Sequence, residues 1–385
     1  MAESRSNVNW RNVVAPCAAV CVFTVSLGEA FPLLSLKLES WGVDPKIIGL
    51  NSATGPLGIL LAGLVIPRLS HAFGPKPVAI FMAIATGLIF LAYPTFPTLW
   101  AWFPLRLLQG MFVATLFALS EAWILGSAGP WRGRIVGVYA TCISATFGIG
   151  PAIVGWVGIE GYAAFAIGAA ILFLATVPIS LVSPPAGERD RQHVSMLHFL
   201  PKAPLLLTAI YAHAIFDGGM LGFVSIYGVR TGMSFEGAAL LLTVLSLGNV
   251  FFQIPIGWIA DRTSKRGTII VCFVVASAGL ALMPFAIGSG WIWPLLLVMG
   301  AAGFGIYTAG LSELGDRFSG ADLIAGTSAF TTIWGLGALT GAILSGFAMD
   351  AFGPHGFPGV LLAVFVCYLA IQAARAVRSR MATAE

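Results

Sequence analysis

Ionisable side chains stand inside long apolar runs of this sequence, where a charge is costly and therefore informative. His213 and Asp217 are four residues apart in the run from Pro204 to Tyr227, so a helix would place them on one face, near its middle. Glu29 stands inside an earlier run. Such groups can take up and release a proton when water reaches them, so Asp217, His213 and Glu29 are candidate proton-coupling residues. The alternative is that they join helices by hydrogen bonds.

Other side chains in these runs could contact a solute. Arg106 could bind a solute or form an ion pair with Glu29, and such a pair could also be a permanent brace. Asn249 and Gln253 share a helix face and can donate and accept hydrogen bonds, although amides of this kind also join helices. Aromatic residues make up 12% of the chain; most of them pack, but some could stack on a flat ring. The candidates for such stacking are Phe216, Tyr307 and Trp334.

These residues must be positioned by membrane-spanning helices, because the chain is too apolar for a soluble protein. Of its 385 residues, 58% are hydrophobic and 9% are charged, whereas a soluble domain carries about 25% charged residues. An apolar run of about 20 residues crosses the membrane as a helix. The runs lie near Val13–Leu36, Ile47–Leu69, Val78–Phe96, Leu99–Ile124, Ile135–Val157, Tyr162–Val182, Pro204–Tyr227, Phe235–Ala260, Thr268–Ile287, Trp291–Leu314, Ile324–Met349 and Phe357–Val377. The sequence therefore predicts an all-α membrane protein with twelve transmembrane helices.

The basic residues predict the orientation of these helices. Most of the 20 Lys and Arg residues fall in connections on the same side as the N-terminus, and basic residues are retained on the cytoplasmic side. Both termini are therefore expected in the cytoplasm, with the chain in a bacterial inner membrane. This placement explains the net charge of +4, so a nucleic-acid partner has no support. The five cysteines all lie in apolar runs and predict neither disulfides nor a metal site.

The runs form two sets of six, separated by the longest polar connection, Ser183 to Lys202. We therefore expect a bundle over residues 1–182, a cytoplasmic linker over 183–203 and a second bundle over 204–385. Landmarks recur at a nearly constant offset in the two halves: Gly63 and Gly257, Leu119–Glu121 and Leu311–Glu313, Glu29 and Asp217. Paired repeats are typical of secondary transporters with a site near the bilayer midplane. Composition alone would also permit a channel or a membrane enzyme.

Three motifs resemble those of the major facilitator superfamily. Gly257–Gly267 is similar to the family's loop between spans eight and nine, Arg106–Gly110 to its span-four motif, and Gly148–Pro151 to its span-five motif. In the first half, Pro67 stands where the family's loop has an Asp, so the resemblance does not imply that loop's charge latch in this half. The resemblance covers almost the whole chain. It implies two pseudo-symmetric six-helix bundles in a secondary transporter that works by alternating access.

Two further segments, Ser120–Trp123 and Met299–Tyr307, are similar to the YcaD-like branch of that superfamily, which includes bacterial importers of copper and of riboflavin. The copper members carry Met-x3-Met and His-x3-Met pairs in spans seven and eight, and neither spacing occurs in this chain. Soft Cu(I) prefers sulfur ligands to amides. The resemblance therefore favours import of a small organic solute, such as a riboflavin-like metabolite. Drug or metabolite efflux by proton antiport, copper import, and a membrane sensor without transport remain open.

Charged residues near the predicted inner ends of the spans are candidate gating residues. They are Glu121, Asp261, Arg262, Arg266 and Glu313. An ion pair between Glu313 and Arg262 or Arg266 would close the inner mouth and break when it opens. The alternative is ordinary interfacial charge, worth under about 1 kcal/mol when solvated.

The sequence shows no arrangement of nucleophile and base and no phosphate-binding loop. We therefore expect no enzyme activity, no fused ATPase, no cofactor and no metal. The expected partners are a small-molecule substrate, protons and the lipid bilayer, and the expected oligomeric state is a monomer.

Overall fold

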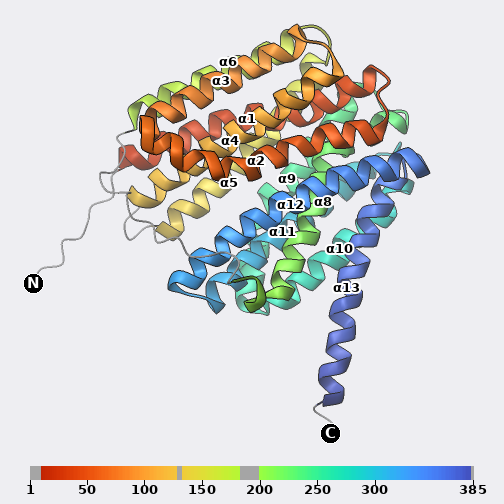
Figure 1. Cartoon of the computed structure of the whole chain (residues 1–385). Helices are drawn as coiled ribbons and strands as arrows, with labels where there is room; N and C mark the ends of the chain where they lie inside the picture. The colour runs from red at the N-terminus through yellow and green to blue at the C-terminus, as the bar shows by residue number, and fades with distance from the viewer. Residues whose placement is uncertain (1–9, 128–131, 183–198, 383–385) are drawn as a thin grey trace, which may run out of the picture. The chain divides into compact units, whose positions relative to one another are not determined.

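The computed structural model describes residues 10–127, 132–182 and 199–382, and within these ranges the regular structure is helical (Figure 1). The first-half helices are α1 (Trp10–Ser40), α2 (Pro45–Phe73), α3 (Pro75–Thr95), α4 (Leu99–Ser127), α5 (Arg132–Val157) and α6 (Ala163–Leu181). A short 3-10 helix, η2 (Leu200–Lys202), precedes α8 (Pro204–Arg230), α9 (Phe235–Arg262), α10 (Lys265–Ala286), α11 (Ile292–Arg317), α12 (Gly320–Phe352) and α13 (Gly356–Ala382). Twelve helices in these ranges are long and apolar enough to cross a membrane, which confirms the predicted fold class.

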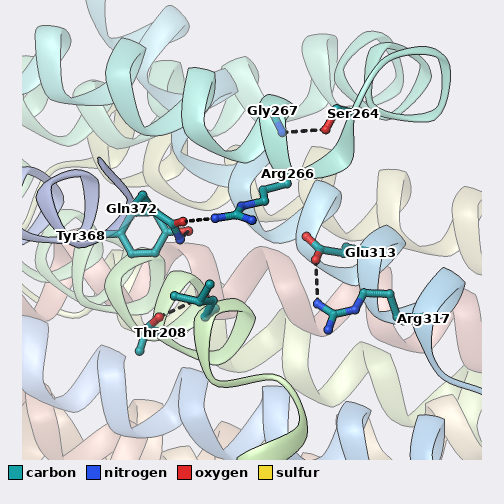
Figure 2. Close-up of polar contacts among 9 residues, drawn as sticks. Thr208, Ser264, Arg266, Gly267, Glu313, Arg317, Tyr368 and Gln372 are labelled. Atoms are coloured by element: carbon teal, nitrogen blue, oxygen red, sulfur yellow. Dashed lines mark hydrogen bonds and ion pairs between the residues drawn. The ribbon is translucent and has the colours of Figure 1, made fainter. Parts of the chain in front are cut away.

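Several helices extend beyond the apolar runs of the sequence. Helix α12 begins at Gly320, four residues before the predicted start at Ile324. Helix α10 begins within the polar loop because the Ser264 side chain accepts a hydrogen bond from the Gly267 backbone N–H at 3.1 Å (Figure 2). Such a cap satisfies a backbone group that a helix start leaves without a partner. The length of an apolar run therefore underestimates the length of these helices.

The chain forms two compact units. The first unit comprises Met1–Lys37 and Thr54–Gln192, and the second comprises Leu38–Ala53 and His193–Glu385. Helix α3 packs on α4 and α6 in the first unit, while α8 packs on α9, α11, α12 and α13 in the second. Most of the predicted linker, residues 183–198, lies outside the described residues. The predicted domain boundaries therefore remain a prediction.

Glycine allows two helix pairs to touch backbone to backbone. In the first unit, a Cβ on Gly58 of α2 would lie 2.1 Å from a carbonyl oxygen of α4, and a Cβ on Gly110 would lie 2.1 Å from one of α2. In the second unit, a Cβ on Gly248 of α9 would lie 2.1 Å from a carbonyl oxygen of α11. A Cβ on Gly300 of α11 would lie 1.9 Å from a carbonyl oxygen of α9. Small residues permit this close approach of membrane helices.

Two further helix crossings, one in each unit, also resemble each other. Helix α1 meets α5 at Gly28 and Gly150, and α8 meets α12 at Gly218 and Gly341. In each case a Cβ would lie within 2.2 Å of a backbone atom of the other helix. All four glycines of the first unit recur in the second at an offset that is constant to within one residue. The repeat thus extends from sequence to helix contacts.

Candidate functional site

Glu29 lies in the first unit, directly after the glycine at the α1–α5 crossing. Its side chain is fully buried, with 0% exposure. Neither carboxylate oxygen has a hydrogen-bond partner among the described residues. Burying an ionised carboxylate without a partner is so costly that such groups take up a proton instead. The geometry therefore favours a neutral carboxylic acid at Glu29 in this conformation.

Helix α6 provides the space that the Glu29 carboxyl group occupies. A Cβ on Gly168 would lie 2.7 Å from Glu29 Oε2 and 2.4 Å from the Phe90 ring. The Ser26 hydroxyl donates a hydrogen bond to the Gly168 carbonyl at 2.8 Å, so it does not serve Glu29. The carboxyl group therefore lies against a glycine and an aromatic ring, in apolar surroundings.

The expected ion pair between Glu29 and Arg106 is wrong for the described residues. Arg106 is also buried, at 4% exposure, but it lies beside α2, where a Cβ on Gly55 would be 3.9 Å from Arg106 Cγ. Glu29 faces α6 instead. The two side chains occupy the same bundle but approach different helices, which spacing along the chain does not specify.

Asp217 of α8 has a different environment from Glu29. Its side chain is 6% exposed, and the Trp334 indole N–H of α12 donates a hydrogen bond to Asp217 Oδ2 at 2.9 Å. A donor of this kind stabilises a carboxylate. Sequence reasoning proposed both residues but did not pair them, because their contact joins segments more than a hundred residues apart.

His213 does not form the predicted pair with Asp217. The two share a helix, but His213 Nδ1 has no hydrogen-bond partner among the described residues. The His213 ring lies 5.7 Å from the Tyr307 ring and 6.2 Å from the Phe304 ring, both on α11. Asp217 instead bonds to α12. Helix α8 therefore directs His213 and Asp217 to different neighbours.

The aromatic candidates divide into packing residues and half-buried ones. Phe216 is fully buried and stacks on Phe365 at a centroid distance of 5.3 Å. It therefore packs α8 against α13 in this conformation, and its contact with a solute stays a prediction. Trp334 and Tyr307 are half-buried, the latter also packing against Phe330 of α12 at 6.1 Å. These two stay candidates for contact with a flat ring.

The amides of α9 show mainly structural contacts. The Gln253 Nε2 group donates a hydrogen bond to the Thr308 hydroxyl of α11 at 3.4 Å, and Gln253 Oε1 has no partner among the described residues. Asn249 is half-buried and already has an interaction of its own. Gln253 therefore joins α9 to α11, and its carbonyl oxygen remains available to accept a hydrogen bond.

In this conformation Glu313 does not pair with Arg262 or Arg266, the partners that the sequence suggested. Figure 2 shows that Glu313 pairs with Arg317 of its own helix, with Nη1 to Oε1 at 3.0 Å. Arg266 instead donates to the Gln372 side chain of α13 at 2.8 Å, and Gln372 donates to the Tyr368 hydroxyl. The i, i+4 spacing of Glu313 and Arg317 explains their pairing.

The other gating candidates also have local partners. Arg262 stacks over the Trp258 ring at 4.1 Å to the centroid. The Asp261 carboxylate accepts a hydrogen bond from Ser312 at 3.3 Å and lies 3.8 Å from Lys265 Nζ.

Lys265 and Glu121 make two further contacts near the predicted inner ends of the helices. Lys265 also pairs with Asp316, so the loop after α9 is tied to α11. Glu121, at the end of α4, is exposed and accepts a long hydrogen bond of 3.5 Å from Tyr139 of α5. Their role as gates stays a prediction.

Among the described residues, no group of three or more His, Cys, Asp or Glu side chains could hold a metal ion. The arrangement instead consists of two separate acids, one in each unit, each beside a glycine crossing. Such an arrangement can bind and release protons and can hydrogen-bond a polar solute.

Comparison with known proteins identifies the family. The profile of the Major Facilitator Superfamily matches residues 16–318 and 230–383. An uncharacterized MFS-type transporter of Bacillus subtilis, YfkF, is 23% identical over 86% of this chain and 87% of its own length. An MFS-type transporter of Escherichia fergusonii, YcaD, is 23% identical over 94% of this chain and 95% of its own. The resemblance to the YcaD-like branch is thus confirmed.

Solved structures show the same fold. A single-residue mutant of the nucleoside transporter NupG superposes with a TM-score of 0.81 at 14% identity, covering 94% of this chain and 99% of its own. A bacterial homologue of the human lysosomal transporter Spinster, in an inward-facing and unoccupied conformation, superposes with a TM-score of 0.74 at 13% identity. The match covers 97% of this chain and 96% of the homologue. Family profile, relatives and fold agree: the chain belongs to the Major Facilitator Superfamily of transporters.

Proposed function

We propose that this transporter couples the movement of a small organic solute to protons by alternating access in a bacterial inner membrane. Glu29 carries the coupling proton in the first unit. Asp217, with His213 nearby along α8, contributes to the solute site of the second unit. The favoured solute is a flat, hydrogen-bonding metabolite that resembles riboflavin.

The observation that carries the proposal is the isolation of the Glu29 carboxyl group. It is fully buried, both oxygens are without a hydrogen-bond partner among the described residues, and Arg106 does not pair with it. A group that only joined helices would be expected to make a hydrogen bond, because an unsatisfied buried polar group destabilises the fold. Bound to a proton, Glu29 fits this site far better than when charged.

Coupling then follows from a difference between conformations. A ligand shifts an equilibrium only when its affinity for the two states differs. Protonated Glu29 fits this conformation, in which the residue is fully buried. Ionised Glu29 requires water or a donor, which favours a conformation that exposes it.

The solute class is supported by the second unit. Half-buried Trp334 and Tyr307 offer aromatic surfaces. The Trp334 indole N–H also donates a hydrogen bond to Asp217. His213 Nδ1 and Gln253 Oε1 are polar atoms without a partner among the described residues. A flat ring with polar edge groups would satisfy both kinds of surface. Efflux of drug-like cations by antiport would use Asp217 instead, whereas copper import has only the isolated Met220 on α8 to offer.

Replacing Glu29 tests the coupling. A difference of about one pH unit across the membrane provides about 1.4 kcal/mol per proton. A tenfold concentration ratio of solute requires the same free energy, so one coupled proton supports up to about tenfold accumulation. We expect the variant Glu29→Gln to reduce the accumulation ratio to about one while it still exchanges labelled solute at equilibrium. The matched control is Glu236→Gln, which removes an exposed acid of α9. Undiminished pH-driven accumulation in Glu29→Gln would exclude Glu29 as the proton carrier.

Thermal stabilisation of the purified protein identifies the solute, because a ligand of the native state stabilises it by about 2.7 kcal/mol at a hundred times its dissociation constant. The compounds to compare are riboflavin, flavin nucleotides, nucleosides, Cu(I) and cationic drugs. We expect a rise in melting temperature with a flat heterocycle and a smaller rise in the variant Trp334→Phe. Stabilisation by Cu(I) alone would contradict the proposed solute class, and stabilisation by cationic drugs alone would favour efflux.

A further inference from the structure

Helix α12 carries a row of hydroxyl side chains that leads to Trp334. The row consists of Thr327, Ser328, Thr331 and Thr332, of which the first three are exposed and the last is half-buried. Helical spacing sets Thr327, Thr331 and Trp334 on one face, with Ser328 and Thr332 beside them. From Thr327 to Trp334 the helix rises by about 10 Å. We name the four hydroxyl residues the hydroxyl stripe.

The hydroxyl stripe ends at the acid of α8. Trp334 donates its indole N–H to Asp217 Oδ2 at 2.9 Å, and an acid within a membrane span faces protein or water rather than lipid. The exposed apolar residues Leu336 and Phe347 lie on a different face of α12 by their spacing. The exposed surface of α12 is therefore divided between an apolar face and a polar stripe beside Asp217.

The threonines of the stripe offer acceptors. Thr331 donates its hydroxyl hydrogen to the Thr327 carbonyl at 3.2 Å, and Thr332 donates to the Ser328 carbonyl at 3.1 Å. A hydroxyl group has one hydrogen and two lone pairs, so both oxygens can still accept a hydrogen bond. The Asp217 carboxylate at the end of the stripe is also an acceptor.

Thr340, further along α12, already acts in this way. Its hydroxyl group donates to the Leu336 carbonyl at 2.8 Å and lies 3.0 Å from the Tyr211 hydroxyl oxygen of α8. Because the hydrogen of Thr340 is used, Tyr211 is the donor of the second bond. A threonine of α12 that bonds to its own helix therefore accepts a hydrogen bond from another hydroxyl group.

We propose that the hydroxyl stripe binds a polyhydroxylated chain of the solute, such as a sugar or sugar alcohol attached to the flat ring, and excludes the phosphate ester of that solute. This inference rests on the proposed solute site of the second unit. A chain of hydroxyl donors matches a row of acceptors that extends for about 10 Å. An ammonium group would instead meet Asp217 alone.

The exclusion of a phosphate follows from charge. Residues 327–336 contain no Lys or Arg. The Trp334 N–H already donates to Asp217. This part of α12 therefore offers a phosphate group no positive charge, and the neighbouring carboxylate repels it.

Three flavins test this class by isothermal titration calorimetry of the purified protein at constant pH. Lumichrome has the ring without the chain, riboflavin adds a chain of hydroxyl groups, and riboflavin 5′-phosphate adds a phosphate. We expect riboflavin to bind at least about tenfold more tightly than either of the others, since two hydrogen bonds of about fivefold each exceed this factor. Adenine, adenosine and adenosine 5′-phosphate repeat the comparison with another ring.

The double variant Thr331→Val with Thr332→Val removes two acceptors and keeps the side-chain shape. We expect it to bind riboflavin at most about twofold more tightly than lumichrome. Thr331→Ser with Thr332→Ser keeps both hydroxyl groups and should retain the preference. The matched control is Thr208→Val, which removes an exposed hydroxyl group on the opposite face of α8 from Asp217.

Within the ring series that binds, equal affinity with and without the chain would overturn the inference and retain a flat solute. Tighter binding of the phosphate ester would do the same, and so would a preference that persists in the valine variant. Binding of cationic drugs alone, or of neither series, would overturn both the inference and the proposed solute class. No pH difference is imposed, so the coupling tested by Glu29→Gln stands or fails separately.

Discussion

At the scale of single residues, Glu29 and Asp217 stand beside corresponding glycines, Glu29 after its glycine and Asp217 before it, and they differ in chemistry. Each adjoins a glycine at a helix crossing, Gly28 for the first and Gly218 for the second. Asp217 has the Trp334 N–H as a donor, whereas Glu29 has no partner among the described residues. We infer that the second unit tolerates a charge at this level of the membrane and that the first unit tolerates one only after rearrangement.

The Trp334 donor can be tested by a double-mutant cycle. Trp334→Phe removes the N–H but keeps an aromatic ring, and we expect a loss of about 1–3 kcal/mol because the carboxylate is left without its donor. In the Asp217→Asn background the same change should cost less, so thermal melting should reveal a coupling of about 1 kcal/mol or more. Trp291→Phe, at an exposed indole, is the control. Additive effects of the two changes would show that the bond does not stabilise Asp217.

The sequence predicted which acids are buried but not their partners. Glu29 and Asp217 were recognisable because an ionisable group in an apolar run is rare. Their orientation depends on helix rotation within the bundle, and α1 turns Glu29 towards Gly168 and away from Arg106. Glu313 likewise pairs with Arg317 one turn away, a contact that spacing alone could have indicated.

At the scale of helices, the glycine crossings explain how two similar bundles are built. The helix count was predictable because apolar length is set by membrane thickness. The crossings were not, because nothing in a single run of sequence distinguishes Gly300, which touches α9, from Gly315 on the same helix, which touches nothing within 4 Å. The ion pair between Glu39 and Arg230 was missed for the same reason, since it joins residues far apart in the sequence.

These two glycines offer a matched comparison within α11. Gly300→Ala should lower stability by about 1–3 kcal/mol, because its methyl group would overlap the Leu245 carbonyl oxygen. Gly315→Ala should raise stability by about 0.4–1 kcal/mol, because alanine reduces the entropy of the unfolded chain. Melting temperatures of the purified variants measure both. Equal melting temperatures would show that the α9–α11 contact is looser than described.

At the scale of the whole molecule, the chain belongs to a transporter superfamily, and the described part of each unit contains one buried acid. Coupled transport needs a proton site whose protonation changes with conformation and a solute site that senses the same change. We propose that Glu29 is the proton site. The solute site is formed by residues of α8, α11 and α12 in the second unit. A molecule with only one of these sites would move its solute downhill.

Proton movement in liposomes tests this account most directly. Purified protein is reconstituted with a pH-sensitive dye inside, and the identified solute is added without any imposed pH difference. We predict that solute movement through the natural protein changes the internal pH, with a sign that distinguishes symport from antiport, and that Glu29→Gln moves solute without this change. An undiminished pH change per solute moved in Glu29→Gln would contradict the central claim.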